Sequence, residues 1–410
     1  MSENIVETTE EENEDEIQIA KPVVNTKKSG KNGSTLVIAC GQGGSRLGNA
    51  IAIYFNSSEN SVYINTSMRD IDGLGIKDTK RLIKVGNSAT VEGAGKDNGV
   101  GNRLLAENKM QLFENIKEKM LEKEYDFVFV VFSTSGGTGS AMGPKITAIV
   151  NSDMIMNQVK EKFGKIPLVF GIAALPEICI DEGNLSYKNT LLCMDDIKKF
   201  VTNETARFIL VNNGYDIVGQ KNHNRVAKLD AVNVSVAIVL NRYFEKYGTS
   251  RISNFDKADR YGALTTMGLH SFMVLENTGD RKAALNPFFI PDGERVKRVC
   301  YEVPEIMEKI VDNAIAATGA IYDDQIHGLY DMEVKENAGL LPIVGFHGFK
   351  NVEKISEQYD KRIKLNEENA KRIEKSNVSA STGLDNVKEV VENAEKEYGR
   401  HGAQSLDDIF

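Results

Sequence analysis

The chain has 410 residues, of which 41% are hydrophobic, and a formal net charge of −9. Its four cysteines stand far apart without CxxC spacing, and no apolar run approaches the roughly 20 residues of a membrane span. These features argue against a protein that coats DNA, a zinc or disulfide scaffold and a membrane protein. We expect a cytoplasmic protein of two packed domains that does not contact membranes.

Both ends of the chain are polar. Residues 1–33 begin with a run of carboxylates and continue with lysines and glycines. Such a stretch cannot bury enough apolar area to order itself, which predicts a flexible N-terminal tail. The polar residues 376–410 predict a second flexible tail.

Five short apolar runs, rich in β-branched or aromatic residues, predict strands that are covered on both faces. They are Thr35–Cys40, Ser61–Ile64, Phe127–Phe132, Ile166–Ala173 and Phe208–Val211. The segments between them, such as Asn102–Lys123 and Tyr187–Asn203, are long enough for crossover helices. This alternation predicts an α/β domain with a parallel sheet over residues 34–227.

The segment from Lys228 to Lys246 has helical spacing and is apolar on nearly all sides. Such a helix is normally buried between two bodies. We therefore predict a central helix and the start of a following loop over residues 228–255, then a smaller α+β domain over 256–346. Apolar residues at helical spacing predict a last helix within 347–375; they are Val352, Ile355, Tyr359 and Ile363.

Four loops rich in glycine and small polar residues are predicted at the C-terminal ends of the strands, the edge where open α/β sheets bind ligands, and three of them are rich in glycine. Glycines let backbone N–H groups approach a phosphate, and the N-terminus of the next helix adds partial positive charge. The first loop contains Gly41, Gln42, Gly43, Gly44, Ser45 and Arg46. The second contains Ser135, Gly136, Gly137, Thr138, Gly139 and Ser140, and the third contains Gly93, Ala94, Gly95 and Lys96.

Two common nucleotide-binding motifs are missing from the sequence. Neither GxxxxGK[ST] nor NKxD occurs, which excludes a P-loop ATPase and a Ras-like GTPase. The second strand is followed by Asn65-Thr66, where an NAD enzyme usually has an acidic residue. This weakens the alternative of an NAD(P)-binding Rossmann oxidoreductase. The five histidines are scattered along the sequence and predict no metal-ligand cluster.

The second glycine loop carries a family resemblance. Its sequence SGGTGSAMGP, from Ser135 to Pro144, resembles the GGGTG[ST]G signature of the tubulin/FtsZ superfamily, with departures at Ser135 and Ala141. The other loops of that family match in order. Gly41–Arg46 resembles its first phosphate loop, Asn65-Thr66 the loop after its second strand, and Gly93–Asp97 its γ-phosphate loop. Pro176 and Glu182 resemble the segment that meets the ribose, although Ser186 replaces the arginine of the division protein.

The resemblance extends to the residues that read the base and to those that act on the γ-phosphate. It implies that Asn212, with Asn213 as an alternative, and Asn233 bind guanine, since an amide offers one donor and one acceptor. An NxDxxD run, Asn254, Asp256 and Asp259, resembles the family's catalytic loop. The implied cofactors are GTP or GDP and Mg²⁺, with the metal ligands left unidentified.

The resemblance also implies a biological role. We expect a tubulin/FtsZ-like fold that stacks head to tail into filaments and hydrolyses GTP at the contact between subunits. The divergent signature is most similar to the plasmid- and phage-encoded TubZ/PhuZ branch, which suggests segregation or positioning of DNA through a small DNA-binding adaptor, without direct DNA binding. The alternatives are a division-type FtsZ-like scaffold and a relative that binds nucleotide without hydrolysing it.

Overall fold

The computed structural model describes residues 34–86, 93–179, 182–214, 225–245, 257–275, 287–330 and 342–372. The two predicted tails, residues 1–33 and 376–410, lie outside the described residues. So do two of the predicted catalytic residues, Asn254 and Asp256.

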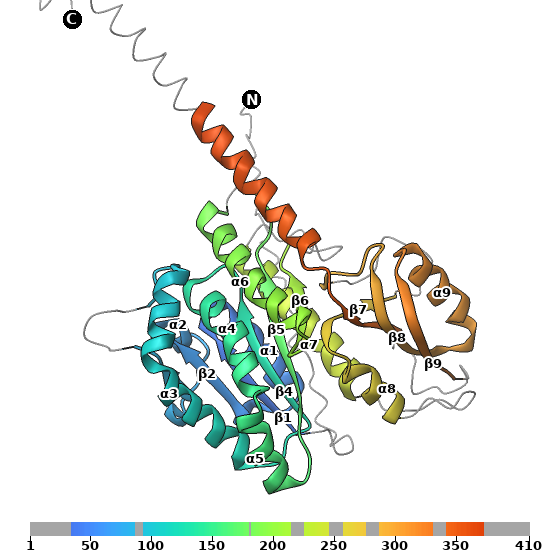
Figure 1. Cartoon of the computed structure of the whole chain (residues 1–410), viewed down its shortest axis with the longest axis horizontal. Coiled ribbons are helices and arrows are strands. Elements are labelled where there is room, and N and C mark those ends of the chain that lie inside the picture. Colours follow the sequence, from blue (N-terminus) through green and yellow to red (C-terminus); the bar gives the residue numbers. More distant parts are fainter. Residues whose placement is uncertain are drawn as a thin grey trace, which may run out of the picture. The chain divides into compact units, whose positions relative to one another are not determined.

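The described strands form one sheet in the order β3-β2-β1-β4-β5-β6-β7-β10-β8-β9 (Figure 1). Their bounds are β1 (Thr35–Cys40), β2 (Ser61–Asn65), β3 (Leu82–Lys84), β4 (Phe127–Ser133), β5 (Leu168–Leu175), β6 (Arg207–Asn212), β7 (Gly268–Val274), β8 (Arg295–Pro304), β9 (Ile321–Tyr330) and β10 (Ile343–Phe349). Strands β1 to β7 pair in parallel, β10 runs antiparallel to both β7 and β8, and β9 is parallel to β8. The predicted α/β class with a mainly parallel sheet is therefore confirmed.

Helices cover both faces of the sheet. They are α1 (Gly41–Tyr54), α2 (Arg69–Asp72), α3 (Asn98–Glu122), α4 (Gly137–Val150), α5 (Asp153–Phe163), α6 (Asn184–Thr202), α7 (Arg225–Glu245), α8 (Lys257–Leu264) and α9 (Glu308–Ala317), with short 3₁₀ turns at Ser58–Asn60, Thr79–Arg81 and Glu305–Met307. Strand β4 shows the two-sided burial: Phe127 and Phe129 pack with α1 and α7, whereas Val128 and Val130 pack with α3, α4 and α6. A strand with both faces covered has no polar alternate, which explains its continuous apolar sequence.

Element boundaries differ from the predicted ones where local chemistry decides them. Strand β5 begins at Leu168 rather than Ile166, directly after Pro167, which has no N–H for a ladder hydrogen bond. Helix α3 begins at Asn98 rather than Asn102, because the Asp97 carboxylate accepts hydrogen bonds from the N–H groups of Gly99 (2.7 Å) and Val100 (3.3 Å).

Helix α7, the predicted central helix, has a buried face. Its residues Val232, Val236 and Leu240 are buried against α1 and the sheet. Near its end, the ring of Phe244 meets the rings of Phe127 at 5.0 Å and Phe129 at 5.3 Å, both edge to face. Because β7 pairs with β6, one sheet continues from the predicted first domain into the second. The domain limits themselves stay predictions.

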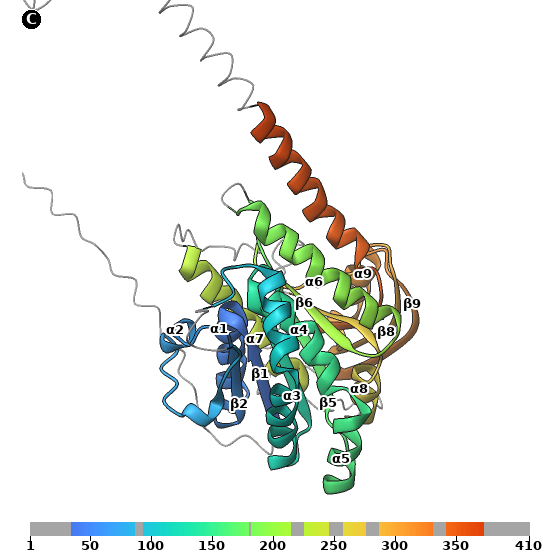
Figure 2. The same ribbon diagram turned by 60° about the vertical axis from the view of Figure 1, so that its left-hand side comes forward.

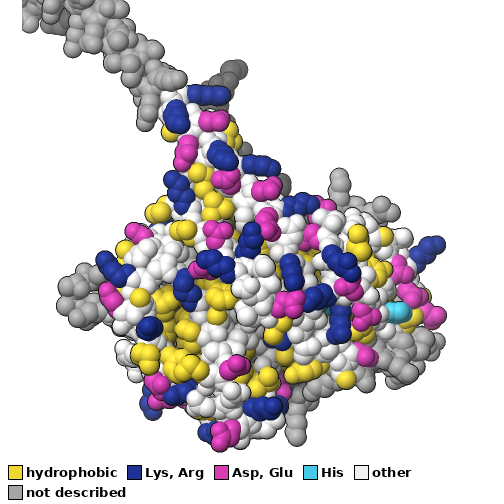
Figure 3. Space-filling model, viewed as in Figure 1, with side chains coloured by type: hydrophobic (Ala, Val, Ile, Leu, Met, Phe, Trp, Pro, Cys, Tyr) yellow, Lys and Arg dark blue, Asp and Glu magenta, His cyan; other side chains and the backbone are white. Residues whose placement is uncertain are grey.

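A last helix over residues 353–372 runs beside α6 in both ribbon views (Figures 1 and 2). The Tyr359 hydroxyl donates to the Pro176 carbonyl at 2.9 Å, and the Lys198 and Glu353 side chains pair at 2.8 Å. Lys and Arg side chains alternate with Asp and Glu along the visible side of this helix (Figure 3). No helix of the described residues is both long and apolar enough to cross a membrane.

Candidate functional site

A cavity of about 520 Å³ lies at the carboxyl edge of the parallel strands. The loops after β1, β2, β4, β5 and β6 all contribute to its wall, as expected for an open α/β sheet. Predicted site residues in the wall are Gly41, Gln42, Gly43, Gly93, Ala94, Gly95, Lys96, Ser135, Gly136, Gly137, Thr138, Gly139, Pro176 and Glu182. Three loops far apart in the sequence therefore meet around one cavity.

Other predicted residues stand behind this wall. Gly44, Ser45, Asn65, Thr66, Ser140 and Asn212 do not line the cavity. Arg46 and Asn233 line a second cavity of about 320 Å³, which lies between α1, α2 and α7 and shares Asp70 with the first. The sequence analysis did not assign the wall residues Cys40, Ser67, Asp70, Ser133, Glu177 and Leu229.

The first turns of α1 and α4 open onto the cavity with free helix N-termini. Neither helix has a side-chain cap, and neither has an acidic residue in its first turn. Helix α3 differs, because Asp97 caps it. The first four N–H groups of a helix need partners outside it, and together with the helix dipole they attract anions. Two uncapped N-termini at one cavity make a strong site for a phosphate chain.

Two glycines let the loops approach one another. Gly41 has φ +71°, and a Cβ built on it would lie 2.9 Å from the backbone N of Gly139. A Cβ on Gly137 would lie 2.7 Å from the backbone N of Asp97 and 2.8 Å from the Cβ of Ala94. Real Cβ atoms do not come this close to backbone, so the loop contacts themselves require glycine at both positions.

Hydroxyl and amide side chains shape the loop after β2. The Thr66 and Thr138 hydroxyls lie 2.7 Å apart and join this loop to the start of α4. The Asn65 amide oxygen accepts from the Thr66 N–H at 2.8 Å, and its NH₂ group donates to the Asp70 carboxylate at 3.2 Å. Asn65 thus folds the loop and directs the Asp70 carboxylate at the cavity.

Asn189 of α6 is a supporting residue that the sequence analysis missed. Its amide nitrogen donates to the backbone carbonyls of both Lys96 (2.6 Å) and Ser135 (3.1 Å). Lys96 has φ +60°, a conformation that non-glycine residues rarely adopt. The buried Asn189 amide therefore holds a strained turn of the third loop against the second loop. Its position in the middle of a helix gave no signal in the sequence.

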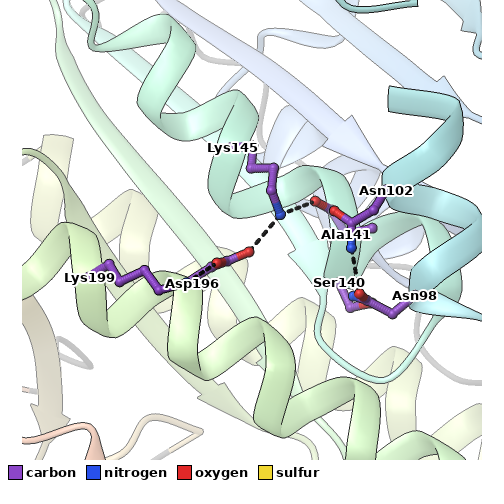
Figure 4. Close-up of polar contacts among 7 residues, drawn as sticks. All are labelled: Asn98, Asn102, Ser140, Ala141, Lys145, Asp196 and Lys199. Atoms are coloured by element: carbon purple, nitrogen blue, oxygen red, sulfur yellow. Dashed lines mark hydrogen bonds and ion pairs between the residues drawn. The ribbon is translucent and has the colours of Figure 1, made fainter. Parts of the chain in front are cut away.

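Behind the second loop, α4 is braced on two sides (Figure 4). The Asn98 amide of α3 donates to the Ser140 hydroxyl at 2.8 Å, and Ser140 donates in turn to the Gly136 carbonyl. On the other side, the Lys145 ammonium pairs with the Asp196 carboxylate of α6 at 2.6 Å. Ser140, predicted as a ligand-binding residue, therefore lies in the bracing.

Asn213, unlike Asn212, is among the residues that line the cavity. Its Oδ1 is buried without a hydrogen-bond partner among the described residues, whereas the Asn212 Oδ1 accepts from the Gly214 N–H at 2.9 Å. Of the two candidates that the sequence left open, Asn213 is thus the one with an unsatisfied group at the wall. Asn233 is one turn beyond the wall residue Leu229 on α7.

Mg²⁺ at a nucleotide site is usually bound through one or two carboxylates and phosphate oxygens. The wall has three carboxylates that could hold such an ion, Asp70, Glu177 and Glu182, and that of Glu177 is paired with Lys228 at 2.9 Å. Among the described residues, no group of three acidic, histidine or cysteine side chains forms a metal cage. Burial raises the pKa of the Cys40 thiol, so this wall residue is no nucleophile.

Asp259 lies on α8, at the opposite edge of the sheet. The Arg207 guanidinium, at the first residue of β6, donates to the carbonyl of Thr265 just after α8 at 2.8 Å. Asn213 follows the last residue of the same strand. Six residues of strand span on the order of 20 Å, so Asp259 cannot reach the cavity of its own chain.

The fold and this cavity define an α/β protein with two uncapped helix N-termini at one cavity, an arrangement suited to a phosphate-bearing ligand. Residues 34–213 match the Tubulin/FtsZ family, GTPase domain. The predicted resemblance to the tubulin/FtsZ superfamily is thereby confirmed, and residues 34–213 are similar to the GTPase domain of that family. These residues contain all the predicted ligand loops, up to Asn213.

Known proteins similar to the chain come from more than one branch. The chain is 25% identical over 241 residues to the tubulin-like protein CetZ of Methanothrix thermoacetophila, and the match spans 55% of this chain and 59% of that protein. The crystal structure of Clostridium botulinum phage c-st TubZ has a TM-score of 0.60 and 18% identity, covering 83% of this chain and 99% of that one. A GTPγS-form protofilament of Bacillus thuringiensis TubZ gives 0.62 and 14%, with 83% and 94% covered. These structural similarities show a tubulin/FtsZ-like fold.

Proposed function

We propose that the chain is an assembly-dependent GTPase that binds GTP in the carboxyl-edge cavity and hydrolyses it where two subunits meet. The observation that carries this proposal is the separation of two half-sites within one chain. The cavity has the phosphate-binding N-termini, while Asp259, on the matching catalytic motif, lies at the other edge of the sheet. Head-to-tail stacking brings the two halves together.

In this arrangement the GTP triphosphate lies on the N-termini of α1 and α4. The third loop, with Lys96, lies beside the γ-phosphate, and Asn213 with Asn233 contacts guanine. A divalent cation at Asp70 would neutralise phosphate charge. The neighbour's Asp259 orients the attacking water. Positioning and charge stabilisation are what phosphoryl transfer requires of a protein, so no strong base is needed.

A heterologous head-to-tail contact does not close on itself and yields filaments. One of the similar solved structures is a GTPγS-form protofilament, which supports self-association of this chain. The similarity to the TubZ of a phage supports a role in segregating or positioning plasmid or phage DNA, through a small adaptor rather than by direct contact. The acidic charge of the chain, −9, fits an adaptor better than direct binding.

The decisive variant is Asp259→Asn, which removes one charge and keeps the size of the side chain. We expect GTP affinity to stay unchanged, because the cavity is about 20 Å away. Turnover per subunit should fall by about a hundredfold or more, and filaments should outlast those of the unmodified protein. Asp323→Asn, an exposed carboxylate on β9, is the matched control and should change neither property.

The measurements are nucleotide binding by calorimetry, phosphate release at several protein concentrations, and sedimentation. Unmodified turnover should rise more steeply than linearly with protein concentration. Turnover that is strictly linear in concentration, or an Asp259→Asn variant with full activity, would contradict hydrolysis in trans.

A further inference from the structure

A buried polar cluster lies at the amino edge of the sheet, away from the nucleotide cavity. Its members come from five elements: Tyr243 of α7, Arg260 of α8, His270 of β7, Glu302 of β8 and His347 of β10. The two histidines are 1% and 0% exposed, and the side chains of Arg260 and Glu302 are each 5% exposed. Burying this much polarity is costly unless each group is satisfied, so the cluster needs an explanation.

The hydrogen bonds of the two histidines run in one direction. His270 Nε2 lies 2.7 Å from the Thr266 carbonyl, which can only accept, so this nitrogen carries a proton. Burial lowers the pKa of His270 to about 3 and that of His347 well below its usual value, so both rings are neutral. His270 Nδ1 must therefore accept from His347 Nδ1, 2.7 Å away, and His347 Nε2 must accept from the Tyr243 hydroxyl at 2.8 Å.

Arg260 joins the same tyrosine from the other side. Its Nη1 donates to the Tyr243 carbonyl at 3.0 Å, its Nη2 donates to the Glu302 carboxylate at 3.0 Å, and its guanidinium carbon lies 5.3 Å from the centre of the Tyr243 ring. Tyr243 is two residues before the end of α7, and Arg260 is in the first turn of α8. One guanidinium thus ties the start of α8 to the end of α7 and to β8.

Arg260 is one of the side chains that hold α8, together with Arg298, whose guanidinium donates to the Gly262 carbonyl at 2.7 Å. The helix has eight residues, and its buried apolar residues are Ala263 and Leu264, three and four residues after Arg260 on the same face. Successive residues of a helix point about 100° apart, so fixing Arg260 inward turns Asp259 toward the partly exposed side. Tyr261, on the other side of Arg260, is 40% exposed, which agrees with this orientation.

The backbone of β10 leaves space for the side chains of Tyr243 and His347. A Cβ built on Gly345 of β10 would collide with the Tyr243 hydroxyl oxygen and with Nε2 of His347. Glycine at this position is therefore required for the Tyr243–His347 hydrogen bond. A buried ion pair is often no more stable than apolar side chains of the same volume, so stability alone does not account for Arg260 and Glu302.

We propose that Arg260 is a positioning residue, held by Tyr243 and Glu302, that sets the direction in which Asp259 is presented to the next subunit's nucleotide. This inference rests on the proposed function. It assigns a role in hydrolysis to a residue whose side chain is only 5% exposed.

The informative variant is Arg260→Met with Glu302→Leu, which replaces the ion pair by apolar groups and leaves no buried charge unpaired. We expect it to fold and to bind GTP as the unmodified protein does. Its kcat should fall about tenfold to a hundredfold, as expected when a reacting group is displaced, with KM within about twofold. Arg260→Lys keeps the charge but loses the two-pronged contact. Its kcat should lie between that of the unmodified protein and that of the double variant. Arg295→Met, which breaks an exposed ion pair, is the control.

Hydrogen–deuterium exchange of residues 257–264 provides a second measurement that does not depend on catalysis. Exchange should be faster in the double variant and unchanged in Arg295→Met. Normal kcat in the double variant beside an inactive Asp259→Asn would overturn the positioning role while leaving the proposed function intact. Full activity of Asp259→Asn would instead overturn the proposed function. Unchanged exchange in the double variant would overturn the positioning role in either case.

Discussion

At the carboxyl edge of the sheet, backbone N–H groups and glycines surround an open cavity. At the amino edge, charged and aromatic side chains pack against one another. The first edge makes its site from the N-termini of α1 and α4, where side chains would obstruct the loops. The second edge makes its contacts from Tyr243, Arg260 and Glu302. Both edges are needed for one reaction if the site is completed between subunits.

This difference between the two edges predicts how each responds to a change of pH and to substitutions. A backbone site is insensitive to pH and to single charge changes, but it cannot accept a Cβ where loops touch. A buried side-chain cluster accepts coordinated replacement, but removing one partner leaves a buried group unsatisfied, at about 3–5 kcal/mol for one side of an ion pair. The following predictions test this contrast, from the largest expected effect to the smallest.

Lowering the pH should destabilise the folded chain through the two buried histidines at the amino edge. In the folded state the pKa of His270 is about 3 and that of His347 is also lowered, while both rise toward 6.5 on unfolding. The unfolded chain therefore binds more protons below pH 6.5, and stability falls as the pH falls. Two such histidines should cost about 2–3 kcal/mol between pH 7 and 5.5.

The measurement is urea unfolding at several pH values. Glu294 has a folded pKa raised to about 7 by burial, so it acts in the opposite sense, and the comparison is best made in a Glu294→Gln background. Replacing His347 with Gln should reduce the pH slope by about half, whatever it does to stability at pH 7. A free energy of unfolding that stays constant from pH 7 to 5.5 would be incompatible with two buried neutral histidines.

At the carboxyl edge, Gly137→Ala should weaken the phosphate loop. Its Cβ would press on the Asp97 backbone and on Ala94, and overpacking of this kind costs about 1–3 kcal/mol. Since the second and third loops must then separate, GTP affinity should fall as well. Gly136→Ala is the control for folding, because its Cβ would meet no protein atom within 4 Å. Equal melting temperatures of the two variants would show that the loop contact is dispensable.

The smallest effect concerns base choice. Asn213→Leu removes the amide whose Oδ1 is unsatisfied at the cavity wall, and we expect the preference for GTP over ATP to fall by about tenfold. Asn212→Leu should disturb the turn at Gly214 more than the preference between bases. Calorimetric titration with GTP and with ATP measures this preference. An unaltered preference in Asn213→Leu would exclude this asparagine from base recognition.

Much of the carboxyl edge was determined by the sequence itself. Continuous apolar runs indicate strands buried on both faces, and small residues directly after them indicate loops that surround a ligand. The loops ending at Gly43, Lys96 and Gly139 line the cavity as predicted. Such features are local, because each strand and the turn after it are adjacent in the chain. The contact that distinguishes Asn212 from Asn213, the hydrogen bond of Asn212 to Gly214, was not evident from the sequence.

Tertiary structure alone decided what joins distant segments. Asn189 reaches a carbonyl 93 residues away, and His270 meets His347 across 77 residues, although nothing in their local sequences relates the two histidines. Nothing in the local sequence of α8 distinguishes Arg260 from a solvated arginine. Its contacts with Tyr243 and Glu302 exist because β7, β10 and β8 are neighbours in the sheet. Pairing of strands distant in sequence is a property of the whole fold, and local spacing carries no record of it.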